Sequence, residues 1–324
     1  MLARRPLLGA GLALPFIRPA AAQGEWPNRT VRIIVPYPPA GSVDVLTRIL
    51  GERLQQQLGQ NFVIENRGGA GGNIGMDVLA KADPDGYTIG SATIGHFSIN
   101  RYLYSRMPFD SDKDFAPVSL TWELPNVFVV SSQHVPARTL QEFIAWAKQK
   151  RGGLSFGSPG VGTTPHLSGA LFNGRVGLNA DHVPFRGAAQ TIPAMLSGDV
   201  TFALDNLSSY VPVVQEGRMR ALAVTSPERV PSLPDVPTMA EAGVPDFVVT
   251  SWSAFVFPAG TPRPIVDRLN AALKAIAADP SVQSRFGQVG AKALWSTPEA
   301  VTERGQKERP MWQEAVRISG ARAD

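Results

Sequence analysis

The chain has 324 residues, of which 44% are hydrophobic and 18% are charged, and it contains no cysteine. A chain of this length can bury a sufficient core without disulfides, so the composition indicates a globular protein, and the length predicts two domains. The 31 Lys and Arg residues exceed the 27 Asp and Glu residues only slightly. No cluster of basic residues with interleaved aromatic residues occurs, so we expect no nucleic-acid partner.

The N-terminus has the pattern of an export signal. Arg4 and Arg5 precede an apolar run at residues 7–17, which is too short to span a bilayer, and three alanines end at Ala22. We expect residues 1–22 to be a signal peptide that is cleaved before Gln23, by either the general or the twin-arginine route. Its removal takes away three arginines and no acid, which leaves 28 basic and 27 acidic residues from the original 31 and 27.

Short apolar runs alternate with amphipathic segments through the rest of the chain. Because strands alternate with helices in this order, we expect an α/β fold with parallel or mixed sheets flanked by helices on both faces. The predicted strands are 31–35, 62–65, 87–91, 127–131, 154–157, 182–185, 200–204 and 221–225. The predicted helices start at Ser42 and at Thr139 and cover 164–172, 188–196 and 264–278.

Two segments, residues 120–127 and 246–253, are predicted to carry the chain between two lobes. Lobe 1 would comprise residues 23–123 and 252–324, and lobe 2 residues 124–251. The C-terminal helices would then pack back on lobe 1. Two crossings make a hinge, and ligands in α/β sheets bind at the carboxyl ends of strands, which here would face the cleft between the lobes.

The loop after the first predicted strand has the features of an anion site. Prolines end the strand, Gly41 permits a tight backbone, and Ser42 occupies the expected N-cap position of a helix. The first turn of that helix would direct unpaired N–H groups and the positive end of its dipole toward a ligand. An ordinary strand–turn–helix unit without a ligand is the competing interpretation.

Two further loops also follow a predicted strand and begin a helix, so they too could bind an anion. Residues 66–75 are rich in glycine and open a helix, but they lack the Lys-Ser/Thr ending of a P-loop and the G-x-G-x-x-G spacing, so a nucleotide is not expected. Residues 158–166 offer hydroxyl and N–H groups, with Thr164 as the expected N-cap and Pro165 at the first helical position. This second loop suits a carboxylate.

The sequence shows few features of a catalytic site or a metal site. The four histidines, His96, His134, His166 and His182, form no metal-binding spacing, and we expect no metal and no cofactor. Ser158 lacks the glycine that a nucleophile elbow needs two residues earlier.

Single polar residues have more than one interpretation. His166 is interpreted as a helix-orienting or pocket hydrogen-bonding group. Asp44 is interpreted as a residue that stabilises a helix through its dipole. For Asp205, capping of the next helix and pairing with a ligand ammonium group stay equally open.

Several motifs resemble the substrate-binding proteins of tripartite tricarboxylate transporters, also called Bug-type receptors. The matching segments are residues 36–44, 65–75, 82–88, 162–167, 183–187, 222–225, 234–238 and 251–252. The family more often has glycine where this chain has Ala40. The resemblance implies a two-lobed periplasmic-binding-protein fold of type II-like organisation, and a periplasmic monomer that delivers a small organic carboxylate to the subunits of a membrane permease. A periplasmic carboxylate sensor and an α/β carboxylate-processing enzyme are the alternatives.

We expect the ligand site to consist of residues in these motifs and in the loops after predicted strands. One carboxylate would be held mainly by backbone N–H groups at residues 40–42 and 68–72 rather than by Arg67, and the second lobe would contact the other end of the ligand. The expected ligand-binding residues are Tyr37, Ala40, Gly41, Ser42, Gly69, Ala70, Gly71, Thr93, Ser158, Gly162, Thr163, Thr164, His166, Arg186, Gly187 and Asp205.

Overall fold

The structure, a computed structural model, describes residues 26–150 and 152–323, so the expected signal peptide of residues 1–22 and the cleavage before Gln23 lie outside the described residues. No helix in the described part of the chain is long and apolar enough to cross a membrane. The strands are β1 (Val31–Val35), β2 (Phe62–Asn66), β3 (Thr88–Thr93), β4 (Phe115–Ser131), β5 (Ser155–Ser158), β6 (Asp181–Pro184), β7 (Phe202–Asn206), β8 (Met219–Val224), β9 (Thr250–Pro258) and β10 (Lys292–Ala293).

The helices lie between and after these strands, and those that begin near residues 42, 139, 164, 188 and 264 are close to their predicted positions. The α-helices are α1 (Ser42–Leu58), α2 (Asn73–Ala80), α3 (Asn100–Leu103), α4 (Leu140–Lys148), α5 (Thr164–Val176), α6 (Ala188–Ser197), α7 (Val211–Gln215), α8 (Arg263–Ala278), α9 (Pro280–Gln288) and α10 (Pro298–Ser319). Two short 3-10 turns, η1 (Ala70–Gly72) and η3 (Leu207–Ser209), and one π-helical turn, η2 (Gly95–Ile99), complete the fold.

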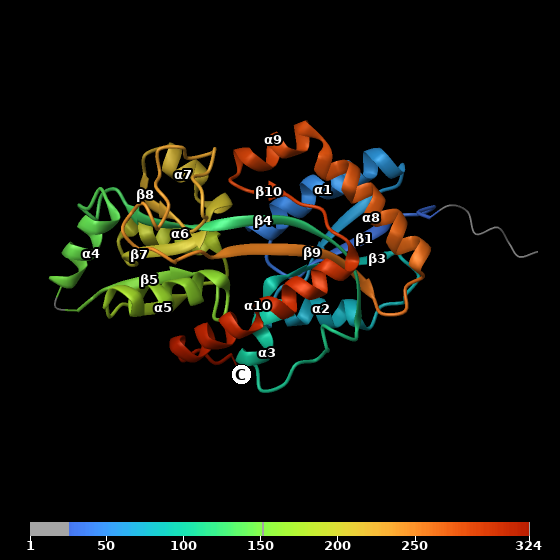
Figure 1. Ribbon diagram of the computed structural model, residues 1–324, viewed down its shortest axis with the longest axis horizontal. Coiled ribbons are helices and arrows are strands. Elements are labelled where there is room, and N and C mark those ends of the chain that lie inside the picture. Colours follow the sequence, from blue (N-terminus) through green and yellow to red (C-terminus); the bar gives the residue numbers. More distant parts are fainter. Residues whose placement is uncertain (1–25, 151, 324) are drawn as a thin grey trace, which may run out of the picture.

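The strands form one continuous mixed sheet in the order β2-β1-β3-β9-β4-β7-β5-β6, and β8 and β10 also pair with β4. β1 is parallel to β2 and β3, and β5 is parallel to β6 and β7. β4 and β9 run antiparallel to their neighbours. The α/β fold with helices on both faces is therefore confirmed, and the expected sheets are two halves of one sheet that share β4 (Figure 1).

The predicted crossing segments lie mostly in these two long strands. Residues 120–127 lie inside β4, which pairs with β9 up to Pro125 and with β7 from Asn126 onward. Residues 250–253 begin β9. Because both crossings are strands paired to each other, they run side by side from one half of the sheet to the other in Figure 1. The division into two lobes stays a prediction.

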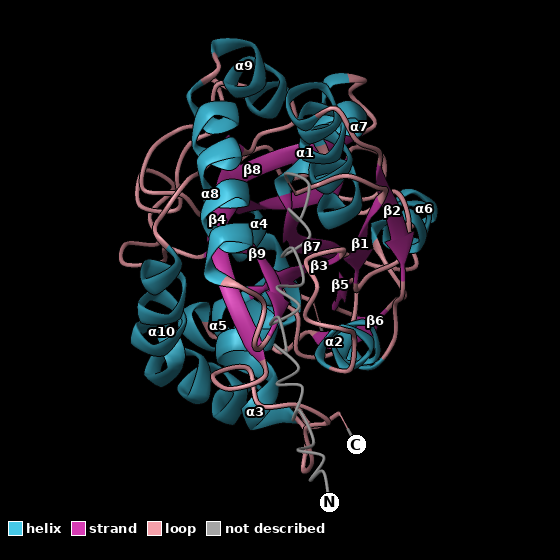
Figure 2. Ribbon diagram, turned by 90° about the vertical axis from the view of Figure 1, so that its right-hand side faces the viewer, coloured by secondary structure: helices cyan, strands magenta, loops and turns pink. Residues whose placement is uncertain are grey.

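Apolar side chains on alternate sides of the strands explain the helical layers. Val127 and Val129 of β4 pack with residues of α6 and α7, while Phe128 and Val130 pack with residues of α4 and α5. In the other half of the sheet, α1, α8 and α9 cover one face, and α2, α3 and α10 cover the opposite face (Figures 1 and 2). The C-terminal helix α10 therefore packs back on the first half of the sheet, as expected.

Two helix caps differ from prediction by one residue. Gly41, not Ser42, is the N-cap of α1, and Thr163, not Thr164, is the N-cap of α5. The Thr163 hydroxyl accepts the hydrogen bond from the His166 amide at 3.5 Å. The Ser42 and Thr164 hydroxyls are therefore available for contacts with other parts of the chain.

Candidate functional site

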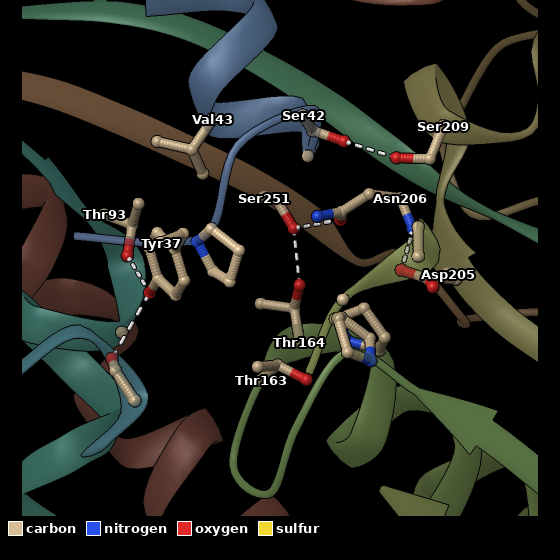
Figure 3. Close-up of a pocket in the computed structure, with 18 of the residues that line it drawn as sticks. Tyr37, Ser42, Val43, Thr93, Thr163, Thr164, Asp205, Asn206, Ser209 and Ser251 are labelled. Carbon is tan, nitrogen blue, oxygen red and sulfur yellow. Dashed lines mark hydrogen bonds between the residues drawn. The ribbon is translucent and has the colours of Figure 1, made fainter. Parts of the chain in front are cut away.

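A cavity of about 340 Å³ lies between the two halves of the sheet, a volume within the range of small-molecule sites. Its wall is formed by the loops that follow β1, β2, β3, β5, β6 and β7, together with residues of β4 and β9. Figure 3 shows Tyr37 and Thr93 on one side and Thr163, Thr164, Asp205 and Asn206 on the other. The carboxyl ends of strands from both halves thus meet at one site, as the sequence predicts.

Three helices begin at this cavity. Gly41 and Ser42 start α1, Thr163 and Thr164 start α5, and Gly187 is the N-cap of α6; all of them line the wall. The first N–H groups of a helix have no carbonyl four residues earlier, and the helix dipole places partial positive charge at this end. The three helix starts together make the cavity favourable for an anion.

The loop before α1 is fixed by Asp44, which is 3% exposed. Its carboxylate accepts hydrogen bonds from the Ala40 amide at 2.9 Å, the Asn66 side chain at 2.9 Å and Arg48 Nε at 3.0 Å. Burial opposes ionisation of Asp44, but these hydrogen bonds outweigh it and lower the pKa of the carboxyl. The Ala40 amide therefore donates its hydrogen bond to Asp44 and is not free to bind a ligand. Asp44 does more than complement a helix dipole: it holds the loop in place.

The glycine-rich loop contributes less to the cavity than expected. Gly71 lines the wall, but Gly69 and Ala70 do not. The carbonyl of Gly71 accepts hydrogen bonds from the Asn100 side chain at 3.3 Å and from the Tyr37 hydroxyl at 3.4 Å. Arg67 forms a salt bridge with Glu65 and does not line the cavity. Which groups hold a ligand carboxylate stays a prediction.

Hydroxyl groups connect the two halves of the sheet around the cavity. The Ser42 hydroxyl of α1 lies 3.2 Å from that of Ser209, which follows β7. The Ser251 hydroxyl of β9 donates to Asn206 Oδ1 at 2.8 Å and also pairs with the hydroxyl of Thr164 (Figure 3). These contacts hold the walls of the cavity together without any charged pair.

Tyr37 and Thr93 form a second polar pair, on the opposite wall (Figure 3). Their hydroxyls are 2.9 Å apart. Burial raises the pKa of Tyr37 to about 12, so its phenol stays protonated and has one hydrogen to donate, which a ligand would take over from the Gly71 carbonyl.

One acid and one cation line the cavity. Asp205 is 1% exposed, and its carboxylate accepts hydrogen bonds from the Asn206 amide at 2.6 Å and from the Tyr210 hydroxyl at 2.9 Å. Burial raises the pKa of Asp205 to about 7 despite these two bonds. Arg186 is the only Lys, Arg or His among the described residues of the wall, and its side chain is exposed. The cavity therefore carries little negative charge to repel an anion.

Ser158 and His166 lie behind the wall and do not line it. The Ser158 hydroxyl lies 2.7 Å from His182 Nε2, the rings of His166 and His182 stack with centroids 3.7 Å apart, and His166 Nδ1 accepts from the Gly162 amide at 3.0 Å. Burial lowers the pKa of His182 to about 4, and burial together with His182 lowers that of His166 to about 3. The two neutral rings support the loop between β5 and α5.

The loop between β5 and α5 lies close to the first half of the sheet at Gly162. This residue has a φ of +75°, and a Cβ there would collide with the side chain of Leu103 in α3. A glycine is therefore needed where the two halves meet.

The cavity wall contains eleven of the expected residues and leaves out five. The residues on the wall are Tyr37, Gly41, Ser42, Gly71, Thr93, Gly162, Thr163, Thr164, Arg186, Gly187 and Asp205, and those away from it are Ala40, Gly69, Ala70, Ser158 and His166. Sequence reasoning missed wall residues on β4, β7 and β9, in and beside η2, and in η3; among them are Ile94, Gly95, Ile99, Asn100, Trp122, Asn206, Ser209 and Trp252. The Ser251–Trp252 motif was the one signal that could have indicated β9.

No group of three His, Cys, Asp or Glu side chains within residues 26–150 and 152–323 is arranged to hold a metal ion. A mixed sheet with helices on both faces and an anion-favouring cavity between its halves is the arrangement of a periplasmic-type solute-binding protein. The family model of the tripartite tricarboxylate transporter family receptor matches residues 46–308. The chain belongs to this receptor family.

Individual relatives agree with this assignment. A protein from Pseudomonas sp. (strain P51), called the UPF0065 protein in the tcbD-tcbE intergenic region, is 38% identical over 97% of this chain and 93% of its own length. The structure of R. palustris Rpa4515 with adipate has a TM-score of 0.88 and 34% identity, covering 91% of this chain and 99% of that one. The structure of MatC from Rhodopseudomonas palustris with bound malate has a TM-score of 0.82 and 32% identity, and the match covers 90% of this chain and 100% of that one.

Proposed function

We propose that this protein binds a small organic carboxylate in the cavity and delivers it to the membrane permease of a tripartite tricarboxylate transporter. The observation that carries the proposal is the convergence of the starts of α1, α5 and α6 on one cavity. The adipate and malate in the two related structures are dicarboxylates, and they support an organic acid as the ligand of this chain.

The ligand would lie between the two polar walls. One carboxylate would accept hydrogen bonds from the N–H groups at the start of α1 and from the Tyr37 hydroxyl, and the other end of the ligand would face α5, α6 and Arg186. Asp205 would add a hydrogen bond in its protonated form or accept one from a hydroxyl or ammonium group. The five expected residues away from the wall would act through the loops that they support.

The remaining features of the proposal follow from this role. The protein would be exported to the periplasm with residues 1–22 removed and act as a monomer. It would act as a receptor without catalytic activity, which its membership of the receptor family supports. The Ser158 hydroxyl, the one nucleophile candidate considered, is buried behind the cavity wall. Residues 23–123 and 252–324 would close against residues 124–251 by bending at β4 and β9 when a ligand binds.

A thermal-shift panel of adipate, malate, citrate and benzoate tests the proposal. A ligand that binds only the folded protein stabilises it by RT ln(1 + [L]/Kd), about 2.7 kcal/mol at one hundred times Kd. We expect at least one carboxylate to raise the melting temperature, and the corresponding primary amides, which lack the charge, to have no effect. Equal effects of acid and amide would contradict an anion site.

A further inference from the structure

Trp252 of β9 is a wall residue whose orientation depends on a helix outside the cavity. Its side chain is fully buried, and it lines the cavity. The indole Nε1–H donates a hydrogen bond to Glu308 Oε2 at 3.0 Å. Glu308 belongs to α10 and is not among the residues of the wall.

Glu308 is the centre of a partly buried network on α10. Its Oε1 accepts from Arg304 Nε at 3.0 Å, and its Oε2 also accepts from Trp312 Nε1 at 3.4 Å. The Arg304 guanidinium lies 5.2 Å from the centre of the Trp252 ring, within the range of a cation–π contact. The indole of Trp252 is therefore held at its N–H group by Glu308 and at its ring by Arg304.

The same network reaches both long strands of the sheet. Arg304 forms a salt bridge with Glu123 of β4 at 3.0 Å and donates to the Thr250 hydroxyl of β9 at 3.4 Å. The side chains of Arg304 and Glu308 are each 22% exposed, so their charges are screened by water less than those of a surface pair. Loss of one partner would leave the others without their hydrogen bonds in a partly dry site.

A second part of α10 supports the wall formed by η2. The Ser98 hydroxyl donates to the Gly305 carbonyl at 2.8 Å, and Arg309 Nε donates to the Phe97 carbonyl at 3.1 Å. The Phe97 ring in turn packs on Trp252 with ring centres 5.6 Å apart. One face of α10 thus lies behind two adjacent parts of the cavity wall.

We propose that Glu308 is a positioning residue of the ligand site, which fixes the indole of Trp252 and thereby sets ligand affinity without touching the ligand. This inference rests on the proposed function, because it assigns the ligand to the cavity that Trp252 lines. It predicts that a change on α10, on the far side of Trp252 from the cavity, alters binding.

The test compares Glu308→Ala and Glu308→Gln with Glu314→Ala, a matched control. Glu314 is on the same helix, exposed, and paired only with Arg317 among the described contacts. Two quantities are measured: the chemical shift and hydrogen exchange of the Trp252 indole N–H by ¹H–¹⁵N NMR, with Trp252→Phe to assign the resonance, and the Kd for adipate and malate by calorimetry well below the melting temperature.

For Glu308→Ala we expect an upfield shift and faster exchange of the Trp252 indole proton, and a Kd that rises about tenfold, within the range of coupling through packed side chains. Glu308→Gln keeps an acceptor oxygen and should recover most of the affinity, and Glu314→Ala should change neither quantity. If Glu308→Ala lowers the melting temperature but leaves Kd unchanged, Glu308 is only structural and the inference is wrong.

The two measurements also distinguish failure of the proposed function from failure of the role proposed for Glu308. If the wild-type protein binds none of adipate, malate, citrate and benzoate, the proposed ligand class fails, while the indole resonance still decides whether Glu308 holds Trp252. An unchanged resonance in Glu308→Ala would reject the positioning role whichever ligand is found.

Discussion

Replacement of Gly41 by valine should abolish most ligand binding while leaving the fold intact. Gly41 has φ −79° and ψ 168°, an extended conformation that valine adopts readily, and a Cβ there would meet only the Pro38 carbonyl at 3.7 Å. The added side chain would instead occupy space at the cavity wall, where Gly41 begins α1. Gly41→Val therefore separates binding from folding.

The magnitude follows from the hydrogen bonds that the new side chain would block. A charge-assisted hydrogen bond contributes about 1.5 to 3 kcal/mol, so loss of access to two N–H groups at the start of α1 should cost about 3 kcal/mol or more, over a hundredfold in Kd. Valine is a poorer N-cap than glycine, which should lower the free energy of unfolding by no more than about 1 kcal/mol.

Calorimetry with the carboxylate that binds best, together with thermal denaturation, measures both effects. Arg67→Ala is the control in the neighbouring loop: Arg67 is paired with Glu65 away from the cavity, so we expect less than a tenfold change, or 1.4 kcal/mol. The reasoning is refuted if Arg67→Ala abolishes binding while Gly41→Val binds within tenfold of the wild type.

Three further predictions concern other parts of the chain. Burial raises the pKa of Asp205 to about 7, above the unfolded value of 3.8, so ionisation of this group destabilises the folded state as the pH rises. From pH 4.5 to pH 7.5 the free energy of unfolding of the wild type should fall by about 3 kcal/mol relative to that of Asp205→Asn, measured by urea denaturation. A difference between the two proteins that does not change with pH would contradict this. Ala40 has φ +65°, so Ala40→Gly should raise the free energy of unfolding by about 0.5 kcal/mol, whereas Ala271→Gly, in the middle of α8, should lower it by about 1 kcal/mol. Intact-mass analysis of the exported protein should show a chain that begins at Gln23, and a retained segment would disprove the processing site.

The sequence predicted most elements because local patterns determine them. The apolar spacing from Leu46 to Leu58 specified α1, and the Thr139 cap is present, with its hydroxyl accepting from the Glu142 amide at 3.2 Å. The first part of β4 was not recognised as a strand, because Pro117 and Pro125 interrupt its pattern. β9 has no proline before its last residue, but its first residues were assigned to a crossing between lobes. Their pairing is long-range and leaves no local signal.

The cavity was predictable only where a loop follows a recognised strand. Gly41, Thr163 and Gly187 could be found because glycine and threonine mark helix starts. The use of the Ala40 amide by Asp44 could not be foreseen, since it depends on how the loop folds back on the helix. Trp122 looks like an ordinary core residue in the sequence, and only the packing of the two halves makes it part of a ligand site.

The pairing of β4 with β9 restricts how the two halves of the sheet can move. The strands are hydrogen-bonded from Phe115 to Pro125 and from Thr250 to Pro258, so neither can twist without the other. Two separate linkers would permit rotation about several axes, but a two-stranded ribbon bends easily only perpendicular to its plane. A motion of this kind would have a single direction. Its narrowest point is where Leu124 and Pro125 face Ser251 and Thr250, because Trp122 and Glu123 are also paired with β10, and Ser253 is also paired with β3. Because Ser251 lines the cavity, this narrow point lies at the wall itself, so bending of the ribbon and reshaping of the wall would be the same event.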